Sequence, residues 1–475
     1  KPQRIKEDLV LAIIGNKTIT IQDFIRRSEY TIRPSYCSRS NYLHKKIVLN
    51  SLIAEKLTAI EMEQKEDKLL ESSHFKTFLK GRREQAMRQI FYNDSFFNSV
   101  KISENEINRN YFFAGRIFQV HYINLPDIKT TQKVIDLTEE DISLDSIYTS
   151  LWEGKTPLRE IDWFNKEPDI IRDQLFNDNI EKGVLLGPFE TEENNYLIME
   201  VLGWVDQPVI TEFDQQTRWN DVDKRLTEIA ATKNYLQYVE ELMSGKKMEL
   251  ISDVFSIYAS LAMDHYLKDD MDKKKALNKA IWDEVEQIEL EYIDKLSGID
   301  PSDILFIYDN KDWTVKDFND LLRSHPLVFR KKKMNKKEFY NQLKFAMADV
   351  LRDMEITNIC YDKDLDHDWR VISNVDQWYD AYASKRYIEK RSKIEMKSEQ
   401  EVLDFFDPVV DSLQQVYSEK IRINMDAFEN IDLTSIDMMV TQQGLPYPIV
   451  VPSFPIITSD SKLNYGKKMD ALNEN

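Results

Sequence analysis

The stretch Asn16–Phe24, NKTITIQDF, decides the fold of this chain because it occurs twice. It recurs as Asn310–Phe318, NKDWTVKDF, at an offset of 294 residues. In the first copy a turn at Gly15–Lys17 is followed by the β-branched residues of Thr18–Ile21. This pattern predicts a β-hairpin whose second strand ends where Gln22–Phe24 enters a helix. The repeat therefore predicts two related modules.

The agreement between the two copies continues without a gap for more than forty residues. Asn41 matches Asn335 and Glu61 matches Glu355 at the same offset. Between residues 43 and 60 apolar residues recur at helical spacing. The shared segment is thus predicted to be a hairpin that leads into a helix, followed by a second helix.

A closing stretch also occurs twice. Lys247–Phe255 recurs as Lys420–Phe428 at an offset of 173 residues. The offsets of 294 and 173 differ by 121 residues, which is about the length of a segment with a different composition. In that segment Ile117–Leu125 and Tyr196–Leu202 are predicted strands. The second copy is therefore expected to be the same framework without this α+β insert.

Composition limits the classes of function. The chain has 475 residues, a net charge of −19 and 42% hydrophobic residues, which is typical of a globular protein and disfavours binding to nucleic acid or anionic lipid. It has no apolar run long enough for a transmembrane helix. A disulfide between Cys37 and Cys360 is possible, but no pattern supports it. The chain begins without Met, which removal of a secretion signal, removal of a lipoprotein leader or trimming would explain.

Four segments, in their order along the chain, resemble the periplasmic foldases of the SurA, PrsA and PpiC type. They are Val120–Ile123, Ile161–Phe164, Gly183–Phe189 and Tyr196–Met199. The resemblance covers residues 8–258 and, through the repeat, 303–430. It implies a mainly helical α+β fold with two SurA-like chaperone units, the first carrying a parvulin-like prolyl isomerase domain. In that fold the closing helix and strand return to the opening module.

The domains expected from the resemblance and the repeat follow the chain in order. They are an N-terminal helical module (1–112), a parvulin-like domain (113–205) and a helical closing segment with a connector (206–302). A second unit without an insert (303–430) and a Pro-rich extended tail (431–475) follow. The tail contains four prolines between 444 and 455, which favour extended backbone. It is expected to be a strap packed on its own domain, with docking to a partner as the alternative.

The resemblance implies catalytic and substrate-binding residues. His121 matches the first of two family histidines, and Leu197 stands where the second belongs. The substrate-binding positions carried over are Ile161, Trp163, Phe164, Leu175 and Leu197. The alternatives are that His121 is a strand histidine satisfied by a hydrogen bond and that Trp163 and Phe164 are core residues. No cofactor is expected.

No metal site is expected either. Asp362, Asp364 and Asp366 have the spacing of the start of a calcium loop, but His367 and Ser373 occupy positions that such a loop reserves for Gly and Glu. The group is interpreted as a solvated acidic turn.

The predicted function is that of a periplasmic chaperone whose isomerase activity is weak or lost, with lipid anchoring left open. Its clients would be unfolded or nascent outer-membrane and secreted proteins. The alternatives are an active prolyl isomerase and an accessory subunit of an outer-membrane assembly or secretion complex. Candidate residues for a client groove are Phe91, Tyr92, Phe96, Phe97, Tyr111 and Phe112, which packing against the insert would explain equally well.

Overall fold

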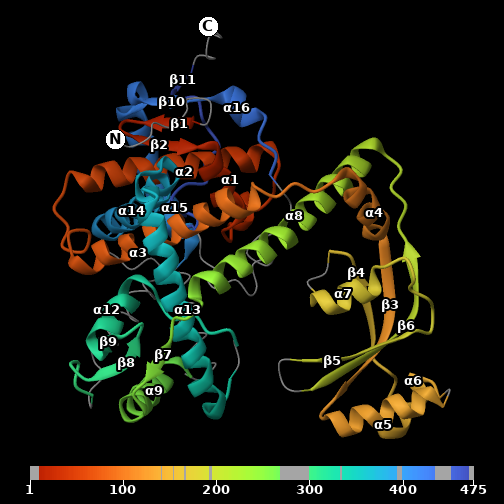
Figure 1. Cartoon of the computed structure of the whole chain (residues 1–475). Coiled ribbons are helices and arrows are strands. Elements are labelled where there is room, and N and C mark those ends of the chain that lie inside the picture. The colour runs from red at the N-terminus through yellow and green to blue at the C-terminus, as the bar shows by residue number, and fades with distance from the viewer. Residues whose placement is uncertain are drawn as a thin grey trace. The chain divides into compact units, whose positions relative to one another are not determined.

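The part of the chain that the computed structural model describes is mainly helical with three small sheets, an α+β fold as predicted (Figure 1). Residues 93–238 form one compact unit, and residues 1–92 together with 239–475 form the other. We call these the insert unit and the main unit. The structure describes residues 10–140, 142–152, 154–164, 167–191, 195–267, 299–331, 334–392, 398–433 and 451–469.

Both copies of the repeat fold as a two-stranded hairpin followed by helices. The first copy consists of β1 (Val10–Ile14), β2 (Lys17–Thr20), α1 (Ile21–Glu29), η2 (Ser35–Cys37), α2 (Tyr42–Glu63) and α3 (Ser73–Tyr92). The second consists of β8 (Ile304–Tyr308), β9 (Lys311–Thr314), α12 (Val315–Ser324), α13 (Lys336–Asp362), η4 (Leu365–His367), α14 (Trp369–Ser392) and α15 (Glu399–Val416). The predicted hairpin and helices are therefore confirmed in both copies.

The same residue types begin the helices in the two copies. Thr20 accepts a hydrogen bond from the backbone N–H of Asp23, whose carboxylate accepts one from the N–H of Thr20. The second copy has the same reciprocal capping box at the start of α12. Asn41 caps α2 and Asn335 caps α13. Repeated sequence thus produces repeated local structure.

The closing strands pair across the two copies. The segment after the insert forms β7 (Met248–Leu250) and α9 (Ser252–Tyr266), and β7 pairs antiparallel with β8 of the second hairpin. The segment after α15 forms η5 (Ser418–Lys420), β10 (Ile421–Ile423) and α16 (Met425–Glu429), and β10 pairs with β1 of the first hairpin. In Figure 1 the blue β10 accordingly lies beside the red β1.

The expectation that each closing segment returns to its own opening module is therefore wrong. The two pairings have equivalent registers, since Ile13 lies opposite Arg422 and Ile307 lies opposite Glu249. Because the repeat makes the two hairpins alike, each accepts the closing strand of the other with the same hydrogen bonds. Two copies of the framework thus exchange their closing strands within one chain.

The third helix of each copy also packs on the other copy. Helix α3 reaches the second module, where Arg88 Nη1 donates to Thr357 Oγ1 at 2.6 Å and Tyr361 OH donates to Glu84 Oε1 at 3.1 Å. A Cβ at Gly81 would lie 2.2 Å from the backbone oxygen of Ser324 on α12, so the crossing requires glycine.

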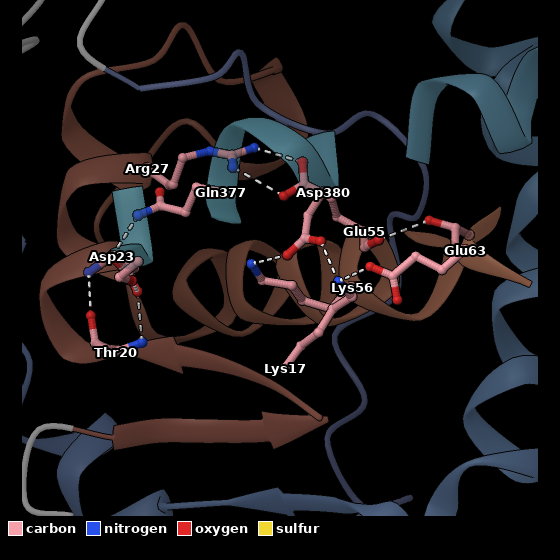
Figure 2. Close-up of polar contacts among 11 residues, drawn as sticks. Lys17, Thr20, Asp23, Arg27, Glu55, Lys56, Glu63, Gln377 and Asp380 are labelled. Atoms are coloured by element: carbon pink, nitrogen blue, oxygen red, sulfur yellow. Dashed lines mark hydrogen bonds and ion pairs between the residues drawn. The ribbon is translucent and has the colours of Figure 1, made fainter. Parts of the chain in front are cut away.

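Helix α14 in turn lies against α2 through buried charges, shown in Figure 2. Asp380 is almost fully buried and accepts from Lys17 Nζ and from Lys56 Nζ, each at 2.6 Å. Lys17 also contacts Glu63 at 2.6 Å. We call these four residues the charge cluster. A carboxylate buried between two ammonium groups fixes the position of the helix, because any shift would leave a charge unpaired.

The last described segment crosses the first module as a strap, residues 451–469. Arg27 Nη2 donates to the backbone oxygen of Ser453 at 2.8 Å, and Asn50 Nδ2 donates to that of Asp460 at 2.7 Å. Ile457 is fully buried, and β11 (Lys467–Lys468) pairs parallel with β10. These contacts support the strap over the docking alternative. Residues 444–450 of the Pro-rich run lie outside the described residues.

The insert unit is built around a four-stranded antiparallel sheet in the order β4-β3-β6-β5. Its elements are the π-helical turn η3 (Asn93–Phe97), α4 (Glu104–Ala114), β3 (Arg116–Leu125), α5 (Ile128–Glu139), α6 (Leu144–Leu151), β4 (Leu158–Asp162), α7 (Asp169–Leu175), β5 (Leu185–Glu190), β6 (Tyr196–Asp206) and most of α8 (Glu212–Met243). One face of the sheet packs on α7 and the other on α5 and α6.

Candidate functional site

Three of the predicted substrate-binding residues lie in one apolar cluster on the α7 face of the sheet. Ile161 on β4 and Leu175 on α7 are fully buried there, and Leu197 on β6 is partly buried. Phe118 and Met199 belong to the same cluster and are fully buried as well. In the structure these side chains form a packed core rather than an open proline pocket.

The two aromatic residues of the predicted site point to different surroundings. Trp163 is buried with Phe113 of α4 and Val222 of α8, in a cluster separate from that of Ile161. The adjacent Phe164 is partly exposed, with its ring centroid 5.3 Å from that of Trp163. Trp163 therefore packs as core, which is the alternative considered for it.

His121 lies half-buried in the middle of β3, opposite Leu158 on β4 and Glu200 on β6. Its Nδ1 is buried and has no hydrogen-bond partner among the residues that the structure describes. The hydrogen bond expected of a satisfied strand histidine is thus not formed at this nitrogen.

The register of the sheet separates His121 from Leu197. Residue 197 lies opposite Asn124, three positions after His121 on β3, and no bulge interrupts the pairing between these positions. Because successive side chains of a strand point to opposite faces, His121 and Leu197 lie on opposite faces of the sheet. A histidine at position 197 would not face His121, so the two-histidine arrangement implied by the resemblance is not built here.

Most of the predicted groove residues are explained by packing. Phe91 and Phe96 are buried, and the ring of Phe96 meets those of Tyr235 and Tyr238 on α8, each at 5.3 Å between centroids. The remaining residues, Tyr92, Phe97 and Tyr111, are half-buried. As groove residues Phe91 and Phe96 are wrong predictions, because both side chains are already buried.

Phe112 differs, because it belongs to a group of exposed apolar side chains in the insert unit. The exposed fractions are 62% for Phe112, 58% for Val205, 87% for Ile210 and 79% for Phe213. We call these four residues the apolar surface. Large apolar side chains exposed to this degree mark an interaction site more often than an inert surface when they lie close together.

Polar contacts connect the segments that carry the apolar surface to one another, within the insert unit. Arg116, at the start of β3, pairs with Asp206 at the end of β6 at 3.2 Å, and its guanidinium lies 5.1 Å from the ring centroid of Phe112. Gln207 N–H donates to the oxygen of Gly115 at 2.6 Å, and Arg218 of α8 donates to the oxygen of Gln207 at 2.9 Å. The four side chains therefore come from adjoining segments.

Three members of the apolar surface were missed by sequence reasoning. The signal is present in the run Gln207–Phe213, where Ile210 and Phe213 stand at the start of a largely polar helix. Such positions pack on a neighbour when one is available. Among the residues that the structure describes, no neighbour covers Ile210 and Phe213, and sequence alone does not distinguish the two cases.

The acidic turn holds a single group with metal-ligand geometry among the described residues. Oxygens of Asp364 and Asp366 and a ring nitrogen of His367 lie within 4.8 Å of one another, with Asp364 and His367 exposed. Exposed carboxylates of this kind are common without an ion, and the solvated turn remains the prediction. Cys37 and Cys360 are both buried and free.

Within the described part of the chain, no helix is both long and apolar enough to cross a bilayer. No family model matches the chain, and no curated protein matches it. Among solved structures the chain is similar to the peptidylprolyl isomerase PrsA of Bacillus cereus, with 14% identity over 48% of this chain and 88% of that one and a TM-score of 0.21. It is similar also to the foldase protein PrsA of Streptococcus pneumoniae, with 10% identity over 48% and 87% and a TM-score of 0.19.

Proposed function

We propose that this protein is an extracytoplasmic chaperone that holds unfolded proteins through the apolar surface and does not rely on prolyl isomerisation. The observation that carries the proposal is the exposure of Phe112, Val205, Ile210 and Phe213 on adjoining segments. Burying a large apolar side chain contributes roughly 1.5–3 kcal/mol, and this burial has no directional requirement. Such a surface suits clients of varied sequence. The net charge of −19 would keep a loaded complex soluble.

The clients proposed are unfolded or nascent outer-membrane and secreted proteins, and the compartment is the periplasm. The support for both is the resemblance of the sequence to periplasmic foldases. The geometry of the insert supports the loss of isomerase activity, since His121 and Leu197 lie on opposite sheet faces and Ile161 and Leu175 are packed as core.

The test is suppression of the aggregation of an unfolded outer-membrane protein. A triple variant with Phe112→Ser, Ile210→Ser and Phe213→Ser should lose most of this activity without loss of fold, because all three side chains are exposed. The matched control is Ile32→Ser with Val416→Ser, which changes two exposed apolar residues of the main unit. Equal suppression of aggregation by the triple variant and the wild type would contradict the proposal.

Isomerase activity is tested in parallel on a proline-containing model peptide. The wild-type chain should leave the isomerisation rate at its uncatalysed value. Acceleration that His121→Ala abolishes would place the protein among active isomerases instead.

A further inference from the structure

A pocket that belongs to the main unit has a charge that its surroundings do not explain. It has a volume of about 760 Å³ and lies where the turn of the first hairpin meets η5, β10 and β11. Ile13, Ile60 and the ring of Tyr417 supply apolar lining. This volume lies in the range of small-ligand sites and leaves room for a few residues of a peptide.

The charged lining of this pocket is mainly cationic, beside the neutral polar residues Asn16 and Gln64. It contains Lys420, Arg422 and Lys467 but only one carboxylate, that of Glu419, in a chain whose net charge is −19. Lys467 pairs with Glu419, and Lys420 lies 5.6 Å from the ring centroid of Tyr417. Arg422 is exposed and has no ion-pair partner in the part of the chain that the structure describes. The pocket thus offers an uncompensated guanidinium beside an apolar wall.

The second module shows that the framework does not need the cation of Arg422, although it keeps a lysine, Lys247, at the position of Lys420. Glu249 takes the place of Arg422, since it lies opposite Ile307 just as Arg422 lies opposite Ile13. Asp309 takes the place of Gly15 in the hairpin turn. The backbone is nevertheless conserved, because Gly15 N–H donates to the oxygen of Lys420 at 3.0 Å and Asp309 N–H donates to that of Lys247 at 3.2 Å. The two modules thus share this backbone with opposite charge at one position, so the fold does not require the guanidinium of Arg422.

We propose that this pocket binds the free carboxylate at the end of an apolar polypeptide chain. Arg422 presents the fork of donors that a carboxylate accepts, and Lys467 and Lys420 add positive charge. Ile13, Ile60 and Tyr417 would cover the last apolar side chain of the peptide. The inference rests on the proposed function, because the unfolded clients of a chaperone supply such chain ends.

The experiment measures fluorescence anisotropy of a dye-labelled hexapeptide of apolar residues that ends in Phe, added to the full chain. The peptide with a free carboxylate should bind about tenfold more tightly than the same peptide with a C-terminal amide, and added salt should reduce the difference. Arg422→Glu should abolish the preference, and Arg422→Lys should keep part of it. Equal binding of the two peptides would overturn the proposal.

Two further arms identify the source of the carboxylate. An amidated peptide with an internal Asp should bind as weakly as the plain amide, and tight binding of this peptide would overturn the assignment to a chain end. Acetate should compete only at concentrations far above those of the peptide, because it cannot use the apolar wall. Competition by acetate at peptide concentrations would show a simple anion site and overturn the proposal as well.

Control variants separate this inference from the proposed function. Arg422→Glu should fold normally, since Glu stands at the equivalent register in β7, and a thermal melt checks this. Glu249→Ala should leave peptide binding unchanged. The triple variant of the apolar surface should lose aggregation suppression but still prefer the free carboxylate. Loss of that preference in the triple variant would show that the peptide binds elsewhere and overturn the pocket assignment.

Discussion

The two hairpin modules are nearly the same in local structure and very different in what surrounds them. Both begin their first helix with a Thr and Asp capping box, yet Asp23 is buried and Asp317 is exposed. Lys17 belongs to the charge cluster, whereas its equivalent, Lys311, is exposed beside Trp313. The repeat therefore sets the backbone of each module, while the elements packed on the module determine how much the same residue contributes to the free energy of unfolding.

The largest expected effect comes from the charge cluster. Asp380→Ala would leave Lys17 and Lys56 with no partner on α14, and breaking a buried ion pair on one side costs about 3–5 kcal/mol. We expect a loss of this size in the free energy of unfolding of the main unit, measured by urea titration.

A substitution at the counterpart of Lys17 in the second module tests this difference between the modules. Lys311→Ala, at the position that matches Lys17, should change the free energy of unfolding by no more than about 0.5 kcal/mol because the side chain is exposed. Equal effects of Asp380→Ala and Lys311→Ala would show that α14 does not give the first module its special stability.

The strap provides the next comparison. Ile457 packs with Ala54 of α2 and with Phe406 and Val410 of α15, so Ile457→Ala should cost about 2–4 kcal/mol through lost burial and a residual cavity. On the second module the position equivalent to Ser51, which lies under the strap, is Phe345, and this residue is 46% exposed.

Phe345→Ala is therefore the matched variant, and it should cost less than about 1 kcal/mol because an exposed side chain leaves no cavity. Thermal melts of both variants decide the point. If Ile457→Ala lowers the melting temperature no more than Phe345→Ala does, the strap does not stabilise the first module, and docking on a partner becomes the better explanation of the segment.

A smaller difference is expected between the two capping boxes. Asp23 accepts from Ser373 Oγ at 2.8 Å and from Gln377 Nε2 at 2.5 Å in addition to its capping contacts, whereas Asp317 makes capping contacts alone among the hydrogen bonds found in the described residues. Asp317→Ala should cost about 1 kcal/mol, the usual value of a cap. Asp23→Ala should cost about 2–3 kcal/mol, since two buried donors on α14 also lose their acceptor. Urea titrations of equal precision on both variants would expose a wrong ranking.

The repeated sequence made the hairpins and the helix starts predictable, because these are local. Asn41 and Asn335 cap their helices as matched residues, and β2 (Lys17–Thr20) lies close to the predicted strand Thr18–Ile21. The exchange of β7 and β10 was not predictable, because a closing strand gains the same hydrogen bonds from either hairpin. What decides between them is the path of the connecting chain, and no single residue encodes that path.

In the candidate site, too, the local features were predictable from the sequence and the non-local ones were not. The strands that carry His121 and Leu197 were predicted, but the face to which each side chain points depends on the register of β3 with β6. A shift of one residue would reverse it. The exposure of Ile210 and Phe213 depended on the absence of covering side chains among the described residues, which no local pattern reveals.

The smallest expected effect is a loss of stability at acid pH. It tests whether carboxylates hold α3 and α14, the helices that pack on the other copy, in place. Asp67, just after α2, accepts from Lys390 and Arg386 of α14. Burial alone would raise the pKa of Asp67, but these two cations outweigh it and lower the pKa to about 2. On the second module burial would likewise raise the pKa of Asp353, but the hydrogen bond from His325 and the charges of Arg88 and Arg352 hold it well below its ordinary value.

A carboxylate whose pKa is lower in the folded state stabilises the fold above its ordinary pKa of about 4 and loses this contribution as the pH falls toward the folded value. The contact at Asp67 should therefore weaken between about pH 4 and pH 2. Asp67→Asn should reduce the acid-induced fall in stability by about 0.5–1 kcal/mol, since Arg386 and Lys390 are partly exposed and solvent screens them. The comparison is the melting temperature at pH 5 and pH 2.5 for the wild type, Asp67→Asn and the exposed control Asp312→Asn. If Asp67→Asn and Asp312→Asn lose equal stability in acid, the docking of α14 on the first module does not depend on the charge of Asp67. The charge cluster would then be the remaining explanation for how α14 is held on that module.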